Sequence, residues 1–449
     1  MSMKALVAGT GIAGTASAEV LLARGAEVTV YDRVDGPALE ALRAAGARVV
    51  HGEEPPLAVL DEVTDVVLSP GFAPHHPLAA AAVARGLDVY CEPELAWRIR
   101  PEGGAPWLAL TGTNGKTTVV TMLAAILSAA GLNTAALGNF GVPLVTAVDA
   151  GYDVLAVELS SFQLYWSRDL APEAGAILNL AEDHLEWHGD FTSYAAAKTN
   201  IWRAGACIGN LDDELTAAAL GEAKGLHVGF TLGHPPAGSF GVIDDVLVDH
   251  TGPEAVELCR TSDVHVPGRH NIANALAAAT LARLHGVKPA AIAAGLRGYT
   301  PEPHRIAHIA TVGGVDYIDD SKATSPHAAN VSLEAYERIV WIAGGQLKGV
   351  DVNELVAAHA HRLHGVVLLG VDRAELAAAV AKHAPGVPIV DIATTAPEEA
   401  MTEAVTAAAR MAHDGDTVLL APVGASKDMY RGYPHRGMAF AEAVEVLSR

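Results

Sequence analysis

The chain has 449 residues, half of them hydrophobic, and its 52 acidic against 30 basic side chains give a formal net charge of −22. Such a length suggests about three domains. The acidic balance argues against nucleic acid and anionic membranes as partners. The cysteines Cys91, Cys207 and Cys259 are scattered without metal-ligand spacing, which predicts reduced thiols in a cytoplasmic protein. A strand pattern from residue 3 predicts no signal peptide, and no apolar run has membrane-spanning length.

Strand-like and helical patterns alternate along the chain, with Gly and Pro between them. This alternation predicts α/β domains, each a mainly parallel sheet with flanking helices. The expected strands lie at residues 5–8, 27–31, 66–68, 107–110, 154–158, 176–178, 338–342, 366–369 and 417–420. Linkers rich in Pro and Gly at 100–106 and 300–303 divide the chain into domains at 1–100, 101–300 and 301–449. We expect a monomer.

The first candidate site follows the first strand, where residues 9–14 have the pattern G-x-G-x-x-G. Asp32 ends the second strand, as the ribose-binding acid of a dinucleotide site does. The loop could bind NAD, bind another nucleotide diphosphate, or only allow tight packing of a strand against a helix. Ser69 and Gly71 follow another strand at the same sheet edge, and they could complete this pocket or form a plain turn.

The most informative segment is TGTNGKTT at residues 111–118. It follows an apolar strand and precedes a helical pattern at 119–130, which is the context of a phosphate-binding loop. In such a loop Lys116 would reach the β- and γ-phosphates, and the Thr117 hydroxyl would bind Mg²⁺. The general pattern G-x-x-x-x-G-K-[ST] needs Gly at the position of Leu110, so this loop is a variant.

Further along, side chains suited to metal binding follow two strands. Glu158 ends a buried strand about forty residues after the phosphate loop, where a Mg²⁺ ligand would lie. His184, within NLAEDHL, could bind a second metal or be a surface histidine. Lys198 lies in a helical pattern and by itself predicts a solvated lysine. Asn271 and Asn274 open an Ala-rich helix and could read an adenine edge or cap the helix.

Polar clusters also follow strands in the last third of the chain. They are DDSKAT at 319–324, GGQLK at 344–348 and GASKD at 424–428, and the segment PHR at 303–305 precedes them. Polar clusters at strand ends usually carry function in α/β folds. We therefore expect these three clusters to form one binding crevice.

Ten segments together show a family resemblance: TGTNGKTT, GNFGVP, ELSSFQL, NLAEDHLEWHG, AAKTNIW, HNIAN, PHR, DDSKAT, GGQLKG and GASKD. They occur in order along the whole chain, which on this basis resembles the muramyl peptide ligases. DSKAT, GGQLKG and ASKD favour the members that add D-glutamate. The resemblance implies Rossmann-like N- and C-terminal domains on either side of a P-loop ATPase-like central domain. It also implies that the first domain binds UDP, the second ATP and the third D-glutamate.

The activity implied by the resemblance is an ATP-dependent ligation. D-glutamate is joined to UDP-N-acetylmuramoyl-L-alanine through an acyl phosphate, and ADP and phosphate are released. The reaction belongs to the cytoplasmic steps of peptidoglycan precursor synthesis, on which cell wall biogenesis, cell shape and cell division depend. The chemistry is consistent, because a carboxylate is a poor acyl donor until a phosphate provides the leaving group.

The resemblance also assigns roles to residues. The catalytic group is Lys116, Glu158, His184 and Lys198. Two Mg²⁺ ions would be held by Thr117, Glu158, His184 and a carbamylated Lys198. ATP would be bound by Gly112, Thr113, Asn114, Gly115, Lys116, Thr117, Thr118, Asn271, Asn274, Arg305 and Asp320. The UDP-substrate would be bound by Gly11, Ile12, Ala13, Asp32, Arg33, Ser69, Gly71, Asn139 and His184. D-glutamate would be bound by Lys322, Thr324, Lys348, Ser426 and Tyr433.

The chain departs from the family pattern in a few places. Ala13 stands where a hydroxyl residue is common, and Arg33-Val34 follows Asp32 in place of a Thr-Arg pair, which affects the expected uridine contacts. The usual Ser-Pro-Ala segment is replaced at 421–423, and Tyr433 stands where Phe is usual. These departures concern binding details and leave the reaction unchanged.

Three alternatives remain open at this point. A folylpolyglutamate synthase-type ligase shares the variant phosphate loop and the metal lysine, but that family starts at the ATPase domain. An NAD-dependent dehydrogenase would use residues 9–14 and leave the second loop and third domain unexplained. The third alternative is a nucleotide-gated binding protein without turnover.

Overall fold

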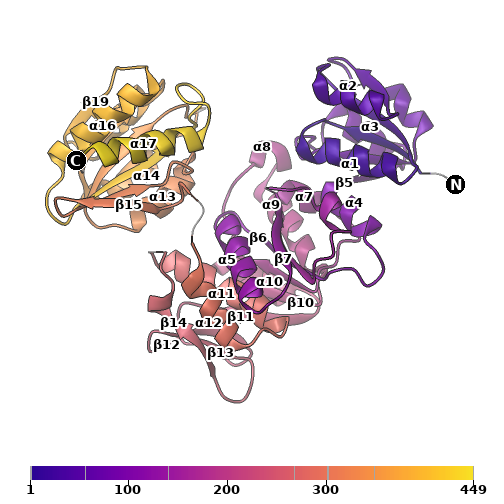
Figure 1. Ribbon diagram of the computed structural model, residues 1–449, viewed down its shortest axis with the longest axis horizontal. Helices are drawn as coiled ribbons and strands as arrows, with labels where there is room; N and C mark the ends of the chain where they lie inside the picture. The colour runs from indigo at the N-terminus through magenta and orange to yellow at the C-terminus, as the bar shows by residue number, and fades with distance from the viewer. Residues whose placement is uncertain are drawn as a thin grey trace. The chain divides into compact units, whose positions relative to one another are not determined.

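The computed structural model describes residues 3–55, 57–139, 141–266, 268–300, 303–347 and 349–447. It contains three sheets flanked by helices (Figure 1), which confirms the expected α/β class. The chain forms two compact units, Met1–His265 with Ile272–Tyr299, and Val266–Asn271 with Thr300–Arg449. The first unit contains the first two sheets, and the second unit contains the third.

The first sheet has five parallel strands in the order β3-β2-β1-β4-β5. Its strands are β1 (Lys4–Ala8), β2 (Glu27–Asp32), β3 (Arg48–His51), β4 (Asp65–Leu68) and β5 (Asp88–Cys91). Its helices are α1 (Ile12–Ala23), α2 (Pro37–Ala44), α3 (Pro77–Ala84) and the 3₁₀ turn η1 (Leu57–Glu62). In β1, Ala5 and Val7 pack into one core while Leu6 and Ala8 pack into another, because successive strand residues face opposite sides. The strand order reverses between β1 and β4, where doubly wound sheets bind ligands.

The second sheet has nine strands in the order β14-β13-β12-β11-β10-β9-β6-β8-β7. They are β6 (Trp107–Thr111), β7 (Thr134–Gly138), β8 (Val154–Glu158), β9 (Ala174–Ile177), β10 (Ala206–Asn210), β11 (Leu226–Phe230), β12 (Ser239–Ile243), β13 (Val246–His250) and β14 (Val256–Arg260). The pairs from β7 to β12 are parallel, and β13 and β14 extend the sheet by antiparallel pairing. Asp244 and Asp245 join β12 to β13 with φ of 49° and 61°, the left-handed backbone that tight hairpins use.

Helices cover the second sheet and link it to its neighbours. They are α4 (Glu92–Ile99), α5 (Lys116–Ala129), α6 (Leu144–Ala147), α7 (Ser161–Tyr165), α8 (Leu185–His188), α9 (Phe191–Thr199), α10 (Glu214–Glu222), α11 (Arg269–Leu284) and α12 (Pro289–Gly298). Two 3₁₀ turns, η2 (Asn200–Arg203) and η3 (Thr261–Asp263), lie between them. The helix α5 buries Val119, Leu123 and Ile126.

The third sheet has the order β15-β16-β20-β17-β18-β19, parallel except for the β15–β16 hairpin. Its strands are β15 (Ala307–Val312), β16 (Val315–Asp319), β17 (Ile339–Gly344), β18 (Leu363–Leu369), β19 (Ile389–Asp391) and β20 (Thr417–Val423). Its helices are α13 (Pro326–Glu334), α14 (Asn353–His359), α15 (Arg373–His383), α16 (Pro397–Met411), α17 (Tyr433–Leu447) and the turn η4 (Ala360–Arg362). Trp341 packs with α13–α15 on one face, while Val340 and Ile342 pack with α16 and α17 on the other.

Most expected strands are present with small shifts at their ends. The helix after the phosphate loop begins at Lys116 rather than at 119, because Gly115 has φ 77° and directly precedes the first helical residue. The expected strand at 176–178 is Ala174–Ile177, and all of it is buried, so no alternation of polar residues marks its ends.

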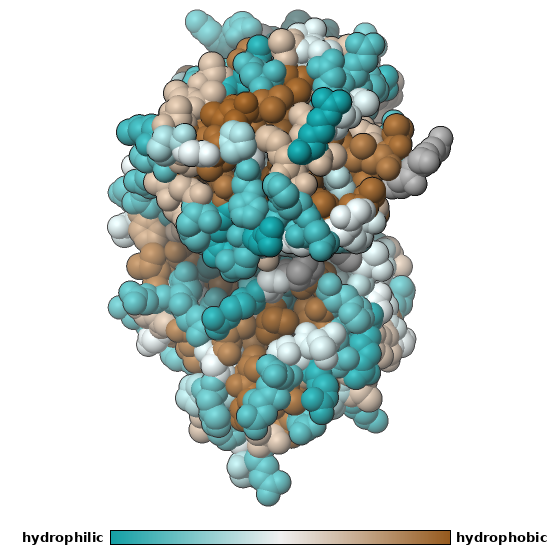
Figure 2. All heavy atoms as spheres, turned by 90° about the vertical axis from the view of Figure 1, so that its left-hand side faces the viewer, coloured by the Kyte–Doolittle hydropathy of each residue, from teal (hydrophilic) through white to brown (hydrophobic). Residues whose placement is uncertain are grey.

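Cys91, Cys207 and Cys259 are buried free thiols. In the described part of the chain, no helix is both long and apolar enough to cross a membrane. Figure 2 shows hydrophilic side chains over much of the face in view, with hydrophobic residues between them.

Candidate active site

The phosphate loop lies between β6 and α5, as the sequence predicts. Its strand is flanked in the sheet by β8 and β9, so the loops after all three strands share one edge. Lys116 is the first residue of α5, and its Nζ donates to Gly112 O and Thr113 O, each at 3.0 Å. The Thr117 side chain is buried in the first turn of the same helix. This arrangement directs a helix N-terminus and an ammonium group toward one anion-binding loop.

Asn179, directly after β9, fixes this loop, and no role was predicted for it. Its Oδ1 accepts from Asn114 N at 2.8 Å, and its Nδ2 donates to Asn114 O at 3.3 Å. The Asn179 carbonyl also accepts from Thr113 N at 3.1 Å. Its position at a strand end within NLAEDHL was the signal in the sequence. Only the pairing of β6 with β9 brings it to the loop.

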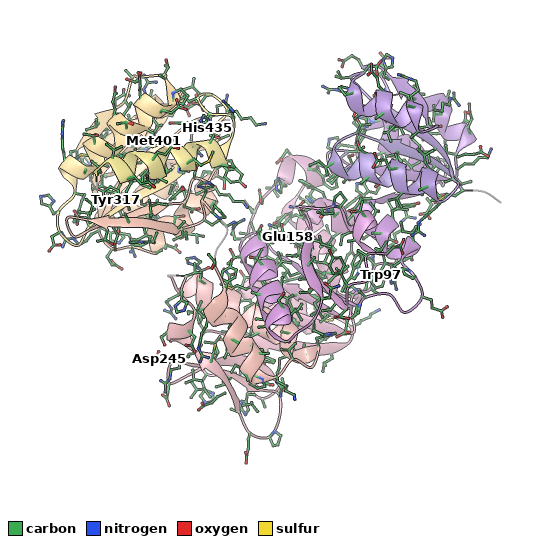
Figure 3. All side chains as sticks on the ribbon, viewed as in Figure 1. Trp97, Glu158, Asp245, Tyr317, Met401 and His435 are labelled. Atoms are coloured by element: carbon green, nitrogen blue, oxygen red, sulfur yellow. The ribbon has the colours of Figure 1, made fainter. Side chains whose placement is uncertain are left out.

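Glu158 lies at the end of β8 (Figure 3). Its side chain is buried, with 2% exposed. Its Oε1 accepts from Asn139 Nδ2 at 3.3 Å, while its Oε2 is buried and has no hydrogen-bond partner among the described residues. A buried carboxylate oxygen without a donor is costly unless a cation or another ligand binds it. The structure thus brings together two residues for which different roles were predicted, Asn139 for the UDP-substrate and Glu158 for a metal.

Lys198, on α9, is buried against the phosphate loop and is not the solvated lysine that its helix alone suggested. Its Nζ donates to Gly112 O at 2.8 Å and to Thr111 Oγ1 at 3.3 Å. Burial is the main cause that lowers the pKa of Lys198 well below its ordinary value, and the nearby Lys116 lowers it further. Asp183 and Glu158 act in the opposite direction. Burial thus makes the charged ammonium form less favourable here than it is in water.

His184 precedes α8, and its side chain is 44% exposed. Its ring lies 4.7 Å from that of Phe162, which also contacts Trp187 and His188. His188 Nε2 lies 3.0 Å from Ser161 Oγ, and burial lowers the pKa of His188 to about 4. Within the described ranges, no group of three or more His, Cys, Asp or Glu side chains is arranged for a metal ion.

Two other residues of the predicted ATP site lie on α11. A Cβ atom on Gly115 would lie 2.5 Å from Asn274 Oδ1, so Asn274 directly abuts the phosphate loop. Asn271 belongs to the second compact unit, where its Nδ2 lies 3.0 Å from His270 Nε2.

The glycine loop of the first sheet is tightly packed. A Cβ on Gly14 would lie 1.9 Å from Gly9 O, so strand and helix need glycine there. Asp32 Oδ2 accepts from the N–H and the hydroxyl of Thr10, both at 2.6 Å, and its Oδ1 accepts from Arg33 N. Partial burial raises the pKa of Asp32, but these hydrogen bonds lower it more, so the net pKa lies below its usual range.

The other residues predicted to bind the UDP-substrate lie around the same loop. Ser69 Oγ donates to Gly9 O at 3.2 Å. Gly11 and Gly71 have open space at the Cβ position, and Ile12 is 77% exposed. Ala13 is the second residue of α1, after Ile12.

In the third sheet, β16, β20 and β17 are neighbours, so the three polar loops that follow them share one edge. The loops after β17 and β20 pair with each other, because Gln346 N donates to Ala425 O at 2.8 Å and Ala425 N donates to Gln346 O at 2.9 Å. Lys322 Nζ lies 5.6 Å from the centre of the Tyr433 ring. Ser426 is buried and Thr324 is exposed. Lys348 lies outside the described residues.

Arg436, on α17, joins two of these loops, and no role was predicted for it. Its Nε donates to Ser321 Oγ at 3.0 Å, its Nη2 to Ser321 O at 2.9 Å and its Nη1 to Gly424 O at 3.1 Å. Burial lowers the pKa of Arg436 to about 10. A buried arginine is visible only in the tertiary structure.

Asp320 is buried at the start of the loop after β16. Burial raises its pKa to about 6, although the Ser332 hydroxyl, which donates to it, and the Arg305 charge both act to lower it. The neighbouring Asp319 lies 2.6 Å from His304 Nδ1. The predicted residues Asp320 and Arg305 therefore interact electrostatically.

Models of protein families match three parts of the chain. Residues 3–91 match the Mur ligase MurD-like N-terminal domain, 110–282 the Mur ligase middle domain, and 304–424 the Mur ligase glutamate ligase domain. The first range contains the glycine loop, the second contains the phosphate loop, and the third contains the polar loops after β16 and β17.

Relatives of the same length are similar throughout. UDP-N-acetylmuramoylalanine–D-glutamate ligases from Streptomyces avermitilis and Thermobifida fusca are 52% and 50% identical, over 98% of this chain and 97% and 98% of theirs. Among solved structures, a pseudomurein peptide ligase type C from Methanothermus fervidus has a TM-score of 0.60 at 18% identity, covering 99% of this chain and all of that one. UDP-N-acetylmuramate-alanine ligase MurC from Thermotoga maritima has a TM-score of 0.57 at 18% identity over both whole chains, which likewise shows the fold alone. Identity of this extent with curated relatives shows that the chain belongs to the Mur ligase family.

Proposed function

We propose that this protein is an ATP-dependent carbon–nitrogen ligase that joins D-glutamate to UDP-N-acetylmuramoyl-L-alanine and releases ADP and phosphate. It acts as a monomer in the cytoplasmic steps of peptidoglycan precursor synthesis. The relatives that are 50% and 52% identical over 98% of the chain carry the names of this activity. Their N-terminal domain is matched here as well, whereas a folylpolyglutamate synthase-type ligase would begin at the ATPase domain.

The observation that carries the proposal is that the side chains of Lys116, Lys198 and Glu158 lie together at or beside the phosphate loop. The buried Lys198 amine donates to Gly112 O in the same loop that Lys116 closes, and the buried Glu158 carboxylate belongs to the neighbouring strand. Cationic and anionic groups at the end of parallel strands suit a triphosphate with a divalent cation. A dehydrogenase function would not explain why the chain has this phosphate loop.

The residues present fit Mg²⁺. Thr117, Glu158, His184 and Lys198 would hold two ions, and Glu158 Oε2, to which no described residue donates, is the kind of oxygen ligand that such an ion prefers. A neutral Lys198 amine can take up CO₂, and the carbamate then presents anionic oxygens. Bound Mg²⁺ would neutralise the charge that develops on the transferred phosphoryl group.

The chain's own groups bind and orient the substrates and stabilise the charge that develops during the reaction. Lys116 and the backbone N–H groups of residues 115–118, at the start of α5, hold the β- and γ-phosphates near the substrate carboxylate. Asn139 binds the muramoyl part, and the glycine loop with Asp32, Ser69 and Gly71 binds UDP. In the third sheet, Lys322, Thr324, Lys348, Ser426 and Tyr433 hold D-glutamate, with two lysines for its two carboxylates. The γ-phosphoryl group passes from ATP to the substrate carboxylate, which releases ADP. The neutral amine of D-glutamate then attacks the acyl carbon and loses a proton, and the tetrahedral intermediate expels phosphate as the amide forms.

A substrate-matrix assay of phosphate release tests the proposal. We expect release that requires ATP, UDP-N-acetylmuramoyl-L-alanine and D-glutamate together. Each substrate is omitted in turn, L-glutamate replaces D-glutamate, and a pteroate replaces the nucleotide sugar. Equal activity with L-glutamate or with the pteroate would overturn the assignment, and an absence of turnover with the complete set would favour a binding protein.

A further inference from the structure

Glu92 is the first residue of α4 and follows the last strand of the first sheet directly. Its side chain is 3% exposed, and its Oε1 accepts from Val145 N at 2.7 Å. The backbone N–H of Leu144 also acts to lower the pKa of this carboxyl group. Leu144 and Val145 are the first two residues of α6. Glu92 therefore caps, from another part of the chain, the helix that follows β7.

This carboxylate is expensive to bury. Among the described residues, no cation lies within ion-pair distance of Glu92, and burial raises its pKa to about 7. Burying a carboxyl group costs free energy that hydrogen bonds from backbone donors only partly return. The same four-residue helix could be satisfied by a Ser or Asp at its own cap position, where the chain has Pro143. The cost therefore points to a need for rigidity at this place.

The segment held in this way carries a predicted ligand of the UDP-substrate. Asn139 lies between β7 and α6, and its backbone N–H donates to Glu158 O at 2.9 Å. A Cβ on Gly138 would lie 2.0 Å from that same carbonyl, so the start of the segment is fixed against β8. Glu92 binds the start of α6, at the other end of the segment. In sequence, Asn139 therefore lies between two held positions, Gly138 and Val145.

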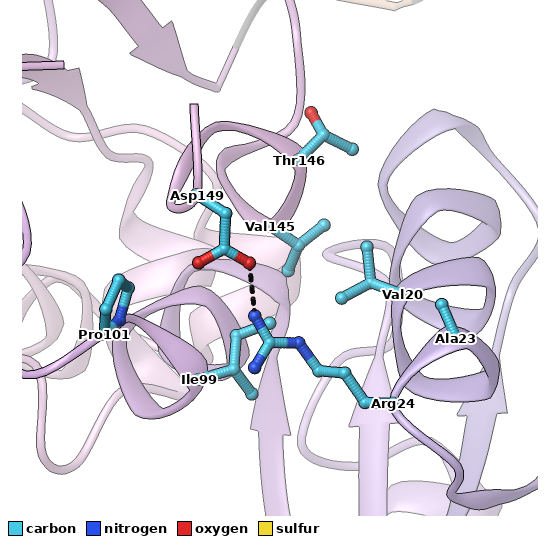
Figure 4. Close-up of a pocket in the computed structure, with 8 residues that line it drawn as sticks. All are labelled: Val20, Ala23, Arg24, Ile99, Pro101, Val145, Thr146 and Asp149. Atoms are coloured by element: carbon cyan, nitrogen blue, oxygen red, sulfur yellow. Dashed lines mark hydrogen bonds and ion pairs between the residues drawn. The ribbon is translucent and has the colours of Figure 1, made fainter. Parts of the chain in front are cut away.

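A third contact, at the far end of α6, is weaker. Arg24 Nη2 lies 2.6 Å from Asp149 Oδ2, but the two side chains are 39% and 62% exposed. They lie at an open pocket of about 620 Å³ between α1 and α6, whose apolar wall includes Val20 and Val145 (Figure 4). An exposed ion pair contributes little to stability. This ion pair, just after the end of α6, provides a control.

A second buried carboxylate on α4 does the same for a different loop. Glu94 accepts from Arg168 N, Asp169 N and Leu170 N at 2.9–3.1 Å, and from Arg98 Nε at 2.9 Å. Glu94 is fully buried and is two residues from Glu92. It therefore serves as a matched control that differs in the loop it holds.

We propose that Glu92 is a positioning residue for the UDP-substrate, because its carboxylate fixes the N-terminal end of α6 and so places Asn139 in its binding position. The expected change in KM rests on the proposed function, whereas the expected change in amide exchange does not. Because Glu92 follows β5 directly, it links the UDP-binding sheet to the loop that would bind the muramoyl part.

The test combines hydrogen exchange with kinetics on the full-length protein. In Glu92→Gln and Glu92→Ala, amide exchange measured by mass spectrometry should speed up in peptides covering residues 139–147. The KM for UDP-N-acetylmuramoyl-L-alanine should rise about tenfold in Glu92→Ala and less in Glu92→Gln, which keeps one acceptor oxygen. The KM values for ATP and D-glutamate should change by less than about twofold.

The controls separate the possible results. Glu94→Gln should speed exchange near residues 168–170 and leave exchange at 139–147 unchanged, and Asp149→Asn should alter neither by much. Unchanged exchange at 139–147 in Glu92→Ala would overturn the inference whatever the activity. Faster exchange with an unchanged KM for the UDP-substrate would overturn the positioning role. A wild-type protein that does not turn over the UDP-substrate would instead refute the proposed function.

Discussion

Asn139 and Glu158 are joined twice, since Asn139 N donates to Glu158 O at 2.9 Å and Asn139 Nδ2 donates to Glu158 Oε1 at 3.3 Å. The residue predicted to bind the muramoyl part thus also orients the carboxylate predicted to bind Mg²⁺. The donor occupies Oε1, and within the described part of the chain Oε2 has no hydrogen-bond partner. Asn139 therefore leaves one oxygen of the carboxylate available to a cation.

Replacing Glu158 with Gln should raise the Mg²⁺ concentration needed for half-maximal activity by at least about tenfold, because the amide removes the anionic ligand. The measurement is a Mg²⁺ titration of phosphate release. Glu173→Gln, which affects a partly exposed carboxylate paired with His285, is the control and should behave like wild type. An unchanged Mg²⁺ requirement in Glu158→Gln would exclude Glu158 as a ligand.

Lys198→Ala should be nearly inactive, because it removes both the amine at the phosphate loop and the predicted carbamate. Added short carboxylates should restore part of the activity by supplying anionic oxygens. The control is Lys224→Ala, at an exposed position. Full activity of Lys198→Ala would reject the carbamate hypothesis, and a loss that carboxylates do not restore would favour a role for the amine itself.

Arg436→Lys should lower the free energy of unfolding by about 2–4 kcal/mol, because lysine keeps a charge in a buried site but cannot bond to both Ser321 and Gly424 through a fork. The KM for D-glutamate should rise with it, since these loops carry its predicted ligands. Urea denaturation followed by circular dichroism measures the first effect. Arg431→Lys, at an exposed position of the same region, should leave both unchanged.

Stability should depend on pH through Glu92. Because burial raises the pKa of Glu92 from 4.5 to about 7, the folded protein binds this proton more tightly than the unfolded chain. This contribution to stability is fully present below about pH 4.5 and is lost as the pH rises through about 7.

Glu92→Gln cannot titrate, so its free energy of unfolding relative to wild type should rise by up to about 3 kcal/mol between pH 4.5 and pH 8. Urea denaturation of both proteins at several pH values measures this difference. A difference that does not vary with pH would show that the Glu92 carboxyl group titrates normally.

The phosphate loop could be predicted from the sequence because its determinants are local. An apolar strand, a glycine turn and a helix follow one another within residues 107–129, and the side chains of Lys116 and Thr117 are placed by that order. Glu158 was predictable for the same reason, as the last residue of a buried strand. The antiparallel extension β12–β14 was not predicted, and it gives the central sheet nine strands.

The burial of particular polar side chains could not be predicted from the sequence. The pattern around Lys198 is that of an ordinary helix, and Glu92-Pro93-Glu94 is typical of an exposed helix start. Their burial depends on which elements pack against them, and that depends on contacts distant in the chain: Glu92 to Val145, Asn179 to Asn114, Arg436 to Ser321.

The sequence by itself determined the class of fold, the order of the loops and the chemistry that each loop offers, because strand, turn and helix patterns act over short distances. Only the tertiary structure decided which side chains meet, which are removed from water, and which of their atoms remain without partners. Those outcomes follow from the strand order of the sheets, which places β6 between β8 and β9 and β20 between β16 and β17. The strand order is fixed by long-range packing, which no local segment of the chain encodes.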